Sequence, residues 1–260
     1  MRNILIIGAG KSTAQLIKYL ADKAPSENLQ LSIADRDLAQ AQALAGNYDC
    51  ANAITLDIYN VEDRKEQITK ADIVISMLPA RLHIDVARDC LALSKNLVTA
   101  SYISDAMKEL DDEVKKKGLV FMNEVGLDPG IDHMSAMRVI DRVRDAGGKM
   151  LLFESFCGGL VAPESDTNLW NYKFTWNPRN VVLAGQGGAA EFIQEGTYKY
   201  IPYQRLIRRT EFLDVEGYGR FEAYANRNSL KYRSIYGLED ILTLYLGTMR
   251  RGGFSRAWNL

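Results

Sequence analysis

The sequence predicts an α/β fold that begins with a doubly wound parallel sheet and continues into an α+β domain with a mixed sheet. Three observations predict it. Apolar runs alternate with amphipathic stretches over the first 125 residues, a glycine pair follows the first apolar run, and the pattern becomes aromatic-rich after Gly126. Alternating strand and helix patterns are typical of βαβ units, which build parallel sheets. At 260 residues the chain also exceeds the usual size of one core, so two domains are expected.

The first domain, residues 1–125, shows the pattern of six strands separated by helices. Aliphatic and β-branched runs indicate the strands, and apolar residues at helical spacing indicate the helices. We expect strands at 3–7, 29–34, 53–56, 72–76, 96–99 and 119–122, and helices at 12–23, 38–45, 61–69, 84–93 and 104–117. Right-handed crossovers between these strands give a doubly wound sheet.

The second domain, residues 126–260, begins where Pro129 and Gly130 start a helix that we expect to continue to about Arg144. Long alternating segments rich in aromatic residues follow, as in antiparallel or mixed strands. These segments are 149–157, 181–184, 190–193, 212–215, 221–224 and 243–249. Their aromatic content favours a homodimer.

Composition and charge narrow the class of partner. The hydrophobic fraction is 47% and the charged fraction 25%, values typical of soluble globular proteins. The 32 basic and 33 acidic residues give a formal net charge of −1, which leaves no basic footprint for nucleic acid or an anionic membrane. The short apolar run Ile4–Ile7 fits neither a signal peptide nor a membrane span. We therefore expect a cytoplasmic protein that acts on a small molecule.

The cysteines and histidines indicate neither disulfides nor a metal. Cys50, Cys90 and Cys157 lie far apart and form no CxxC pair, which agrees with a reducing compartment. His83 and His133 are the two histidines, and their spacing does not match a zinc site. No metal is expected.

A phosphate-binding turn is the clearest motif of the first domain. Gly8-Ala9-Gly10 follows a hydrophobic strand and precedes a helix, so the backbone can approach a pyrophosphate that faces the helix N-terminus. This is the Rossmann arrangement that binds NAD or NADP. The expected cofactor contacts in the turn are Gly8, Ala9, Gly10, Lys11 and Ser12. Thr13 occupies the third glycine position, a departure that we expect to loosen the packing of helix on strand.

Asp35 ends the second expected strand, where an acid hydrogen-bonds the adenosine ribose hydroxyls and favours NAD. Arg36 beside it can stack on adenine or meet the 2′-phosphate of NADP, so the choice between the two stays open. A merely structural turn, with Asp35 as a helix cap, is less favoured by the ordered strand–turn–helix context. A P-loop is disfavoured because its spacing requires glycine where Leu5 stands.

The segment Met77–Ala80 follows the fourth strand at the carboxyl edge, where doubly wound sheets place their ligands. Leu78 and Pro79 are therefore candidate cofactor contacts. An ordinary turn before the next helix is the alternative, and the pattern alone favours neither.

From the fifth strand onward, longer segments match a known family. They are Ser101–Ser104, Asn123–His133, Ser155–Leu160, Ala162–Glu164, Tyr172–Trp176, Asn226–Ser229 and Gly247–Arg250. Over essentially its whole length the chain resembles the saccharopine dehydrogenase (glutamate-forming), or saccharopine reductase, family. The resemblance implies NAD(P)-dependent oxidation of saccharopine to glutamate and aminoadipate semialdehyde, or the reverse reductive condensation.

The resemblance also implies the site residues. Substrate contacts fall on Ser101, Tyr102, Asp128, Arg227, Thr248, Met249 and Arg250, and further cofactor contacts on Leu127, Asp128 and Pro129. The residue types suit a ligand with three carboxylates, since the two guanidinium groups can hold carboxylates bidentately and Asp128 can pair with an ammonium. The hydroxyls of Ser101 and Tyr102 can orient the substrate or pass a proton. The general acid or base stays unassigned, with Tyr102 and Asp128 as candidates.

The resemblance implies a longer chain than this one, so we expect the second domain to be incomplete at Leu260. Two other interpretations stay open. One is a related amino-acid or imine dehydrogenase, such as one for lysine, because substrates change easily on a shared fold. The other is a non-catalytic, cofactor-binding fragment. Three results distinguish the interpretations. Turnover of saccharopine supports a saccharopine dehydrogenase, turnover of another amino acid supports a related dehydrogenase, and nucleotide binding without turnover supports a cofactor-binding fragment.

Overall fold

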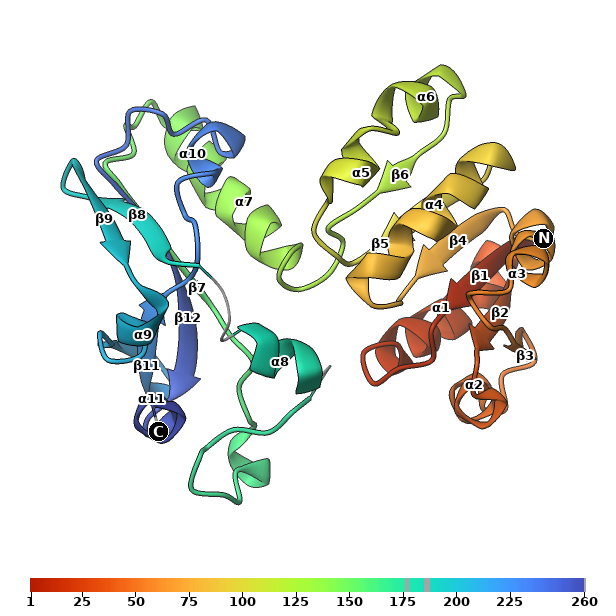
Figure 1. Cartoon of the computed structure of the whole chain (residues 1–260), viewed down its shortest axis with the longest axis horizontal. Coiled ribbons are helices and arrows are strands. Elements are labelled where there is room, and N and C mark those ends of the chain that lie inside the picture. Colours follow the sequence, from red (N-terminus) through yellow and green to blue (C-terminus); the bar gives the residue numbers. More distant parts are fainter. Residues whose placement is uncertain (176–177, 185–187, 260) are drawn as a thin grey trace. The chain divides into compact units, whose positions relative to one another are not determined.

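The computed structural model describes residues 1–175, 178–184 and 188–259 (Figure 1). The chain divides into two compact units, Met1–Ile131 and Asp132–Leu260, each with its own sheet and core. The domain boundary expected after residue 125 stays a prediction.

The first unit contains a parallel sheet of six strands in the order β3-β2-β1-β4-β5-β6. The strands are β1 (Arg2–Ile7), β2 (Leu29–Asp35), β3 (Ala51–Thr55), β4 (Ile73–Ser76), β5 (Asn96–Thr99) and β6 (Phe121–Met122). In register, Ile4 of β1 lies opposite Leu31 on one side and Ile73 on the other. The chain order reverses between β1 and β4, which makes their carboxyl ends a switch point for ligands. The predicted doubly wound sheet is confirmed.

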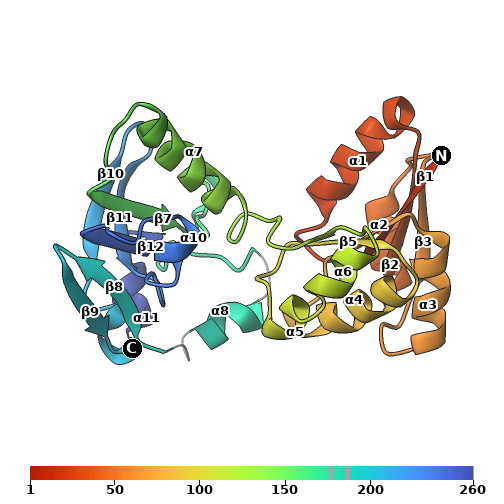
Figure 2. The same ribbon diagram turned by 90° about the horizontal axis from the view of Figure 1, so that it is seen from above.

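Alternation along the strands gives this unit two apolar cores, one on each face of its sheet. The connecting helices are α1 (Ala14–Glu27), α2 (Leu38–Ala45), α3 (Val61–Lys70), α4 (His83–Ala92), α5 (Asp105–Lys108) and α6 (Asp111–Lys116), with a 3₁₀ turn at Ala80–Leu82. Ile4 and Ile6 pack with residues of α1 and α2, whereas Leu5 and Ile7 pack with residues of α3 and α4. Figure 2 shows α1 and α4 on opposite faces of the sheet.

The helix expected at 104–117 is two short helices. Glu109 and Leu110, which separate them, keep right-handed helical backbone angles. The N–H of Leu110 bonds three residues back to Met107, as in a 3₁₀ turn, instead of four. The helical residue pattern continues across this point although the hydrogen bonding changes. The prediction of one continuous helix was therefore wrong.

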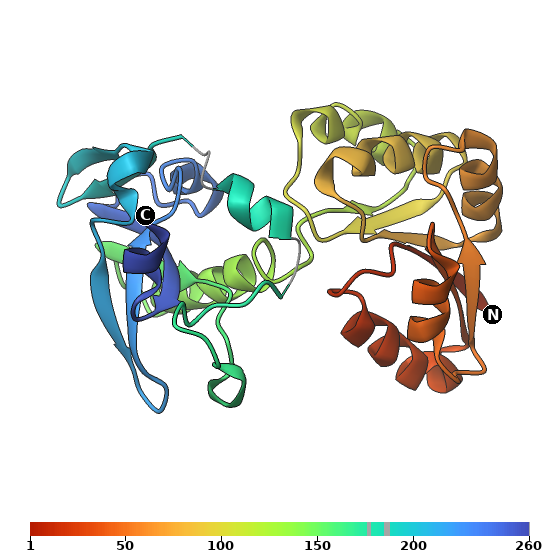
Figure 3. The same ribbon diagram turned by 60° about the horizontal axis from the view of Figure 1, so that its bottom comes forward.

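The second unit contains a mixed sheet, coloured green to blue in Figure 3. Its strands are β7 (Leu152–Cys157), β8 (Ala190–Gln194), β9 (Thr197–Ile201), β10 (Glu211–Val215), β11 (Gly219–Ala225) and β12 (Thr243–Arg251). The order is β10-β11-β12-β8-β9 in antiparallel pairs, and β7 joins β12 in parallel. The mixed sheet predicted for this region is confirmed.

Helices complete the second unit. They are α7 (Ile131–Asp145), α8 (Pro178–Ala184), α9 (Tyr203–Leu206), α10 (Tyr232–Ile235) and α11 (Phe254–Trp258), with a 3₁₀ turn at Pro163–Ser165. Ala136 and Ile140 of α7 pack against Phe153 and Leu244 of the sheet. In the described part of the chain, no helix is long and apolar enough to cross a membrane.

Two sequence assignments in this unit were wrong. The strand expected at 181–184 is the end of α8, which starts at Pro178, because proline at the first position of a helix costs no hydrogen bond. Strand β9 was missed. It follows β8 through Glu195 and Gly196, which both have positive φ, as the tight turn of a two-residue hairpin requires. Trp176, part of one matching segment, lies outside the described residues.

Candidate functional site

The turn after β1 is closed so tightly that a side chain at its first residue would be strained. Gly8 has φ +111°, and a Cβ atom there would lie 3.0 Å from the carbonyl oxygen of Met77. Its N–H donates to the carbonyl of Ala34 at 2.8 Å. A side chain at this position would therefore meet both backbone strain and the loop that follows β4.

Thr13 closes this turn from the start of α1. The residue is 1% exposed, and its hydroxyl donates to the carbonyl oxygen of Gly8 at 3.1 Å. The looser packing of helix on strand that we expect from the missing third glycine stays a prediction. In the described chain, the backbone N–H groups of Gly10, Lys11 and Ser12 donate to no protein acceptor. They remain available in front of α1, where a helix N-terminus favours an anion.

Asp35 joins the end of β2 to the same turn. One carboxylate oxygen accepts the N–H of Ala9 at 2.7 Å, and the other accepts the N–H of Asp37 at 3.0 Å. Arg36 between the two acids is exposed. Asp35 and the glycine turn, which were predicted separately, are thus joined by a hydrogen bond.

The loop after β4 lies against the turn. The N–H of Met77 donates to the carbonyl of Ile7 at 2.8 Å, which extends the β1–β4 pairing beyond β4. Leu78 is half-buried and Pro79 exposed, and the carbonyl of Pro79 accepts the N–H of Leu82 as the 3₁₀ turn begins. The structure therefore places Leu78 and Pro79 directly after the residue that contacts Gly8.

A buried histidine connects the ends of β4 and β5. His83, 4% exposed, has its Nδ1 atom 2.8 Å from the hydroxyl of Ser76 and its Nε2 atom 2.8 Å from the hydroxyl of Ser101. The hydroxyl of Thr99 lies 3.1 Å from the same Nε2 atom. Burial lowers the pKa of His83 to about 4, so the ring is neutral at neutral pH. A neutral imidazole donates from one nitrogen and accepts at the other, which fixes the orientation of the Ser101 hydroxyl.

Tyr102 and Asp128 meet beside Ser101. The Tyr102 hydroxyl donates to the Asp128 carboxylate at 2.5 Å, and both residues are exposed. The segment that carries Asp128 is held against the loop after β5 by Glu124. The N–H of Glu124 donates to the carbonyl of Ser101, and the Glu124 carboxylate accepts the N–H of Ile103. Pro129 is buried, whereas Leu127 is 61% exposed.

In the second unit, Arg250 lies among aromatic rings. Its guanidinium carbon is 5.3 Å from the ring centre of Tyr172 and 5.2 Å from that of Phe254, distances at which a cation is attracted to a ring face. One guanidinium nitrogen donates to the carbonyl of Met249 at 3.0 Å. In the described residues no carboxylate pairs with this guanidinium.

The other candidates of the second unit lie on or near β12. Thr248 and Arg250 point to one face of the sheet and Met249 to the other, because successive strand residues alternate. Arg227, just beyond β11, is exposed and has φ +36°. Its carbonyl accepts the N–H of Glu191 at 2.7 Å, which fixes the backbone at this position.

Comparisons with known proteins decide the family. Residues 4–122 match the saccharopine dehydrogenase NADP binding domain, and residues 126–260 match the saccharopine dehydrogenase C-terminal domain. The chain belongs to the saccharopine dehydrogenase family. The resemblance inferred from the sequence segments is thereby confirmed.

Curated relatives and one solved structure agree with this saccharopine dehydrogenase family assignment. Saccharopine dehydrogenase (NADP(+), L-glutamate-forming) of Saccharomyces cerevisiae is 37% identical over 254 residues, which cover 97% of this chain and 56% of that protein. Mitochondrial alpha-aminoadipic semialdehyde synthase of Rattus norvegicus is 35% identical over 99% of this chain and 28% of its own length. Apo saccharopine dehydrogenase (L-Glu forming) from S. cerevisiae superposes with a TM-score of 0.89 at 36% identity, covering 98% of this chain and 56% of that one. The chain thus spans little more than half of the S. cerevisiae protein.

The NADP-binding domain of this family member fits a dinucleotide at the turn. The tight glycine turn, the N–H groups of residues 10–12 and the start of α1 together provide donors suited to an anion. The expectation of an NAD(P) cofactor is thereby supported by both the geometry and the matching domain.

The sequence reasoning did not find His83 as part of this site. Its partner Ser76 ends β4 and its partner Ser101 follows β5, so their spacing along the chain carries no recognisable motif. The available signal was the position of the histidine just after a strand that ends at the ligand-binding edge of the sheet.

Proposed function

We propose that this chain is an NAD(P)-dependent oxidoreductase that oxidises saccharopine, or forms it by the reverse reaction. The observation that supports this most directly is the group of Ser101, Tyr102 and Asp128 at the edge of the sheet that also carries the phosphate-binding turn. Polar groups are thus available beside a dinucleotide. The family and the printed activity of its relatives give the substrate class.

In the proposed reaction, hydride leaves the carbon attached to the secondary amine of saccharopine, and water hydrolyses the resulting imine to glutamate and aminoadipate semialdehyde. The cofactor supplies the hydride acceptor. Asp128 attracts the amine in its ammonium form, and Tyr102, hydrogen-bonded to Asp128, can pass a proton to or from that carboxylate. Ser101, oriented by His83, directs its hydroxyl to a polar group of the substrate. Leu127, Asp128 and Pro129 complete the proposed cofactor contacts.

In the second unit, Arg227 and Arg250 are proposed to bind substrate carboxylates, and Thr248 to lie on the same face of the sheet as Arg250. Met249, whose side chain points to the other face, is proposed to contribute through its backbone carbonyl, which accepts from Arg250. Among the described residues neither guanidinium has a carboxylate partner, and one Arg250 nitrogen donates to the Met249 carbonyl, so the remaining donors are available for a ligand. Arg250 lies against the rings of Tyr172 and Phe254, whose centres are 5.1 Å from each other, so little side-chain freedom would be lost when it binds an anion.

The direct test is the absorbance of reduced nicotinamide when the purified chain meets saccharopine with NAD⁺ and, separately, with NADP⁺. Arg250→Gln should lower kcat/KM by roughly tenfold to a hundredfold, since a hydrogen bond to a charged group is worth about 1.5–3 kcal/mol. Arg220→Gln is the matched control, because Arg220 also lies over a ring, that of Phe212 at 4.5 Å, but belongs to no proposed contact.

Each outcome of this assay has a distinct meaning. Turnover of saccharopine whose kcat/KM falls by roughly tenfold or more in Arg250→Gln and is kept in Arg220→Gln supports the proposed function. Turnover of lysine or another amino acid, with none of saccharopine, replaces it with the related dehydrogenase. Dinucleotide binding without turnover of any amino acid leaves the cofactor-binding fragment.

We further propose that the protein is a cytoplasmic homodimer. Its three cysteines are free, which agrees with a reducing compartment. The second unit exposes aromatic side chains suited to an interface, among them Tyr218 at 73% and Tyr200 at 62%. The molar mass in solution, measured by light scattering, tests the dimer, since a monomer of 29.2 kDa would contradict it.

A further inference from the structure

The carboxylate of Asp35 is fixed at the adenosine end of the dinucleotide site. It ends β2 and accepts two backbone N–H groups, one from Ala9 inside the phosphate-binding turn at 2.7 Å and one from Asp37 at 3.0 Å. The backbone carbonyl of Asp35 is held as well, by the N–H of Leu56 at 2.9 Å. The side chain therefore cannot rotate away from the turn without losing two hydrogen bonds.

Each Asp35 oxygen accepts one N–H and keeps a further lone pair, because a carboxylate has about four acceptor positions. Ribose hydroxyls are donors and suit those positions. A phosphate on the 2′ oxygen carries −1.5 to −2 charges near pH 7 and offers acceptors. Beside Asp35, the phosphate oxygens would meet carboxylate oxygens that are also acceptors, and the two negative charges would repel each other.

The residues next to Asp35 do not make the segment positively charged. Asp37 caps α2, its carboxylate accepting the N–H groups of Ala39 and Gln40 and the side-chain amide of Gln40. Those hydrogen bonds lower the pKa of Asp37, with the Gln40 side chain the largest cause, so Asp37 is ionised at neutral pH. The segment of Asp35, Arg36 and Asp37 thus carries two negative charges and one positive.

We propose that Asp35 makes this dinucleotide site select NAD(H) over NADP(H), although the matching family domain is an NADP-binding one. The proposal rests on the dinucleotide site and not on the substrate. Asp35 supplies both an acceptor for the 2′-hydroxyl and repulsion against a 2′-phosphate. Arg36 is exposed, so its attraction for a phosphate is weakened by solvent, whereas the Asp35 carboxylate is half-buried and held in the turn.

Calorimetric titration with NADH and NADPH tests the proposal without any amino-acid substrate. The same titration with 5′-AMP and adenosine 2′,5′-bisphosphate isolates the 2′-phosphate. The wild-type chain should bind the unphosphorylated member of each pair more tightly by about tenfold or more, because one uncompensated charge acts on a near-dianion. Asp35→Asn, of equal size, and Asp35→Ser should both shift the ratio towards the phosphorylated member by about tenfold.

Two control variants make the result specific. Asp57→Asn removes an exposed acid just beyond β3 at the same edge and should leave both ratios unchanged. Arg36→Gln should weaken NADH and NADPH alike. The proposal is overturned if the wild-type chain binds NADPH at least as tightly as NADH, or if Arg36→Gln weakens NADPH alone while Asp35→Asn leaves the ratio unchanged. It is also overturned if neither dinucleotide binds, whereas absence of saccharopine turnover would leave it intact.

Discussion

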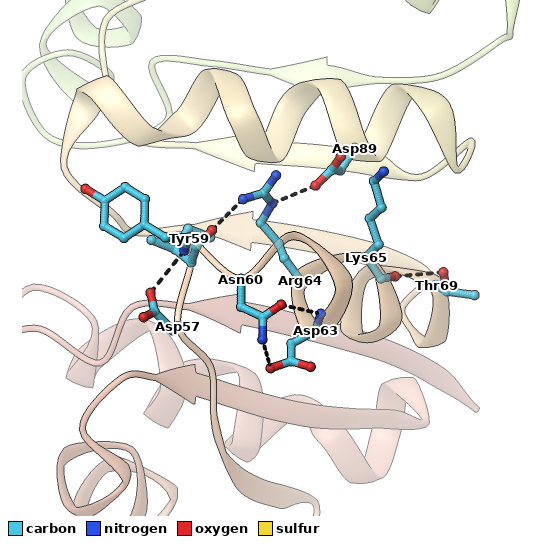
Figure 4. A network of polar contacts seen from close by, with 9 residues as sticks. Asp57, Tyr59, Asn60, Asp63, Arg64, Lys65, Thr69 and Asp89 are labelled. Carbon is cyan, nitrogen blue, oxygen red and sulfur yellow. Dashed lines mark hydrogen bonds and ion pairs between the residues drawn. The ribbon is translucent and has the colours of Figure 1, made fainter.

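A buried ion pair between α3 and α4 gives a sharp test of what holds the first unit together. Arg64 and Asp89 are joined Nε to Oδ2 at 2.6 Å, and their side chains are 8% and 10% exposed (Figure 4). The Arg64 guanidinium also donates to the carbonyl of Ile58. Because water cannot solvate either charge, each depends on the other.

Replacing Arg64 with methionine keeps most of the volume and removes the partner of Asp89. Breaking a buried pair from one side costs about 3–5 kcal/mol, because an uncompensated charge stays in the interior. The first unit has 131 residues, from Met1 to Ile131. At about 2.1 cal/mol/K per residue its unfolding entropy is near 0.28 kcal/mol/K, so its Tm should fall by roughly 11–18 °C.

Thermal unfolding followed by far-ultraviolet circular dichroism measures this loss, and tryptophan fluorescence separates the units. All three tryptophans, Trp170, Trp176 and Trp258, belong to the second unit, so their transition should change little. Combining Arg64→Met with Asp89→Leu should recover most of the stability, because the stranded charge is removed.

Lys70 and Glu66 of the same helix are the matched control. They are also 2.6 Å apart, but each side chain is 60% exposed. Lys70→Met should cost less than about 1 kcal/mol, as exposed pairs do. A cost for Arg64→Met no larger than that of Lys70→Met would refute the argument from burial.

Three further predictions follow from individual residues. His83 has a pKa of about 4 in the folded chain against an ordinary 6.5, so on acidification the unfolded chain binds a proton first. About 3 kcal/mol of stability that is present above pH 6.5 should therefore be lost between pH 6.5 and 4. Urea denaturation across that pH range should show a weaker dependence of stability on pH for His83→Gln. Gly158→Ala would place a Cβ atom 2.0 Å from the carbonyl of Met249, so the tryptophan transition should shift by about 2 kcal/mol or more towards instability, and an unchanged midpoint would contradict the geometry. Asp37→Ala removes the cap of α2 and should cost about 1 kcal/mol in the circular dichroism transition, whereas Asp37→Asn should retain most of it.

The sequence predicted the first unit well because its signals are local. Short aliphatic runs rich in β-branched residues favour strands buried on both faces, and Gly8 between strand and helix marks the turn. Where the prediction was wrong, local hydrogen bonding decided the outcome. The N–H of Leu110 bonds to the carbonyl of Met107, and the helix expected at 104–117 is divided there.

Site residues were harder to predict than strands. The polar partners of His83 are brought together by the pairing of β4 with β5, which no spacing along the chain encodes. Arg250 was expected from family resemblance, yet its aromatic surroundings come from Tyr172 and Phe254, whose roles depend on how the loops of the second unit fold. Sequence patterns identify residue types at an edge, and packing determines which of them meet.

The strand order of the first unit also bears on how such proteins diverge. Asp35 ends β2 and Ser101 follows β5, and β1 and β4 stand between these two strands in the sheet. If Asp35 selects the dinucleotide and Ser101 contacts the substrate, as proposed above, these two selections are made on opposite sides of the β1–β4 pair. Substitutions that change the nucleotide preference would then leave Ser101 in place, and substitutions around Ser101 would leave Asp35 in place, so the two preferences can evolve at separate rates.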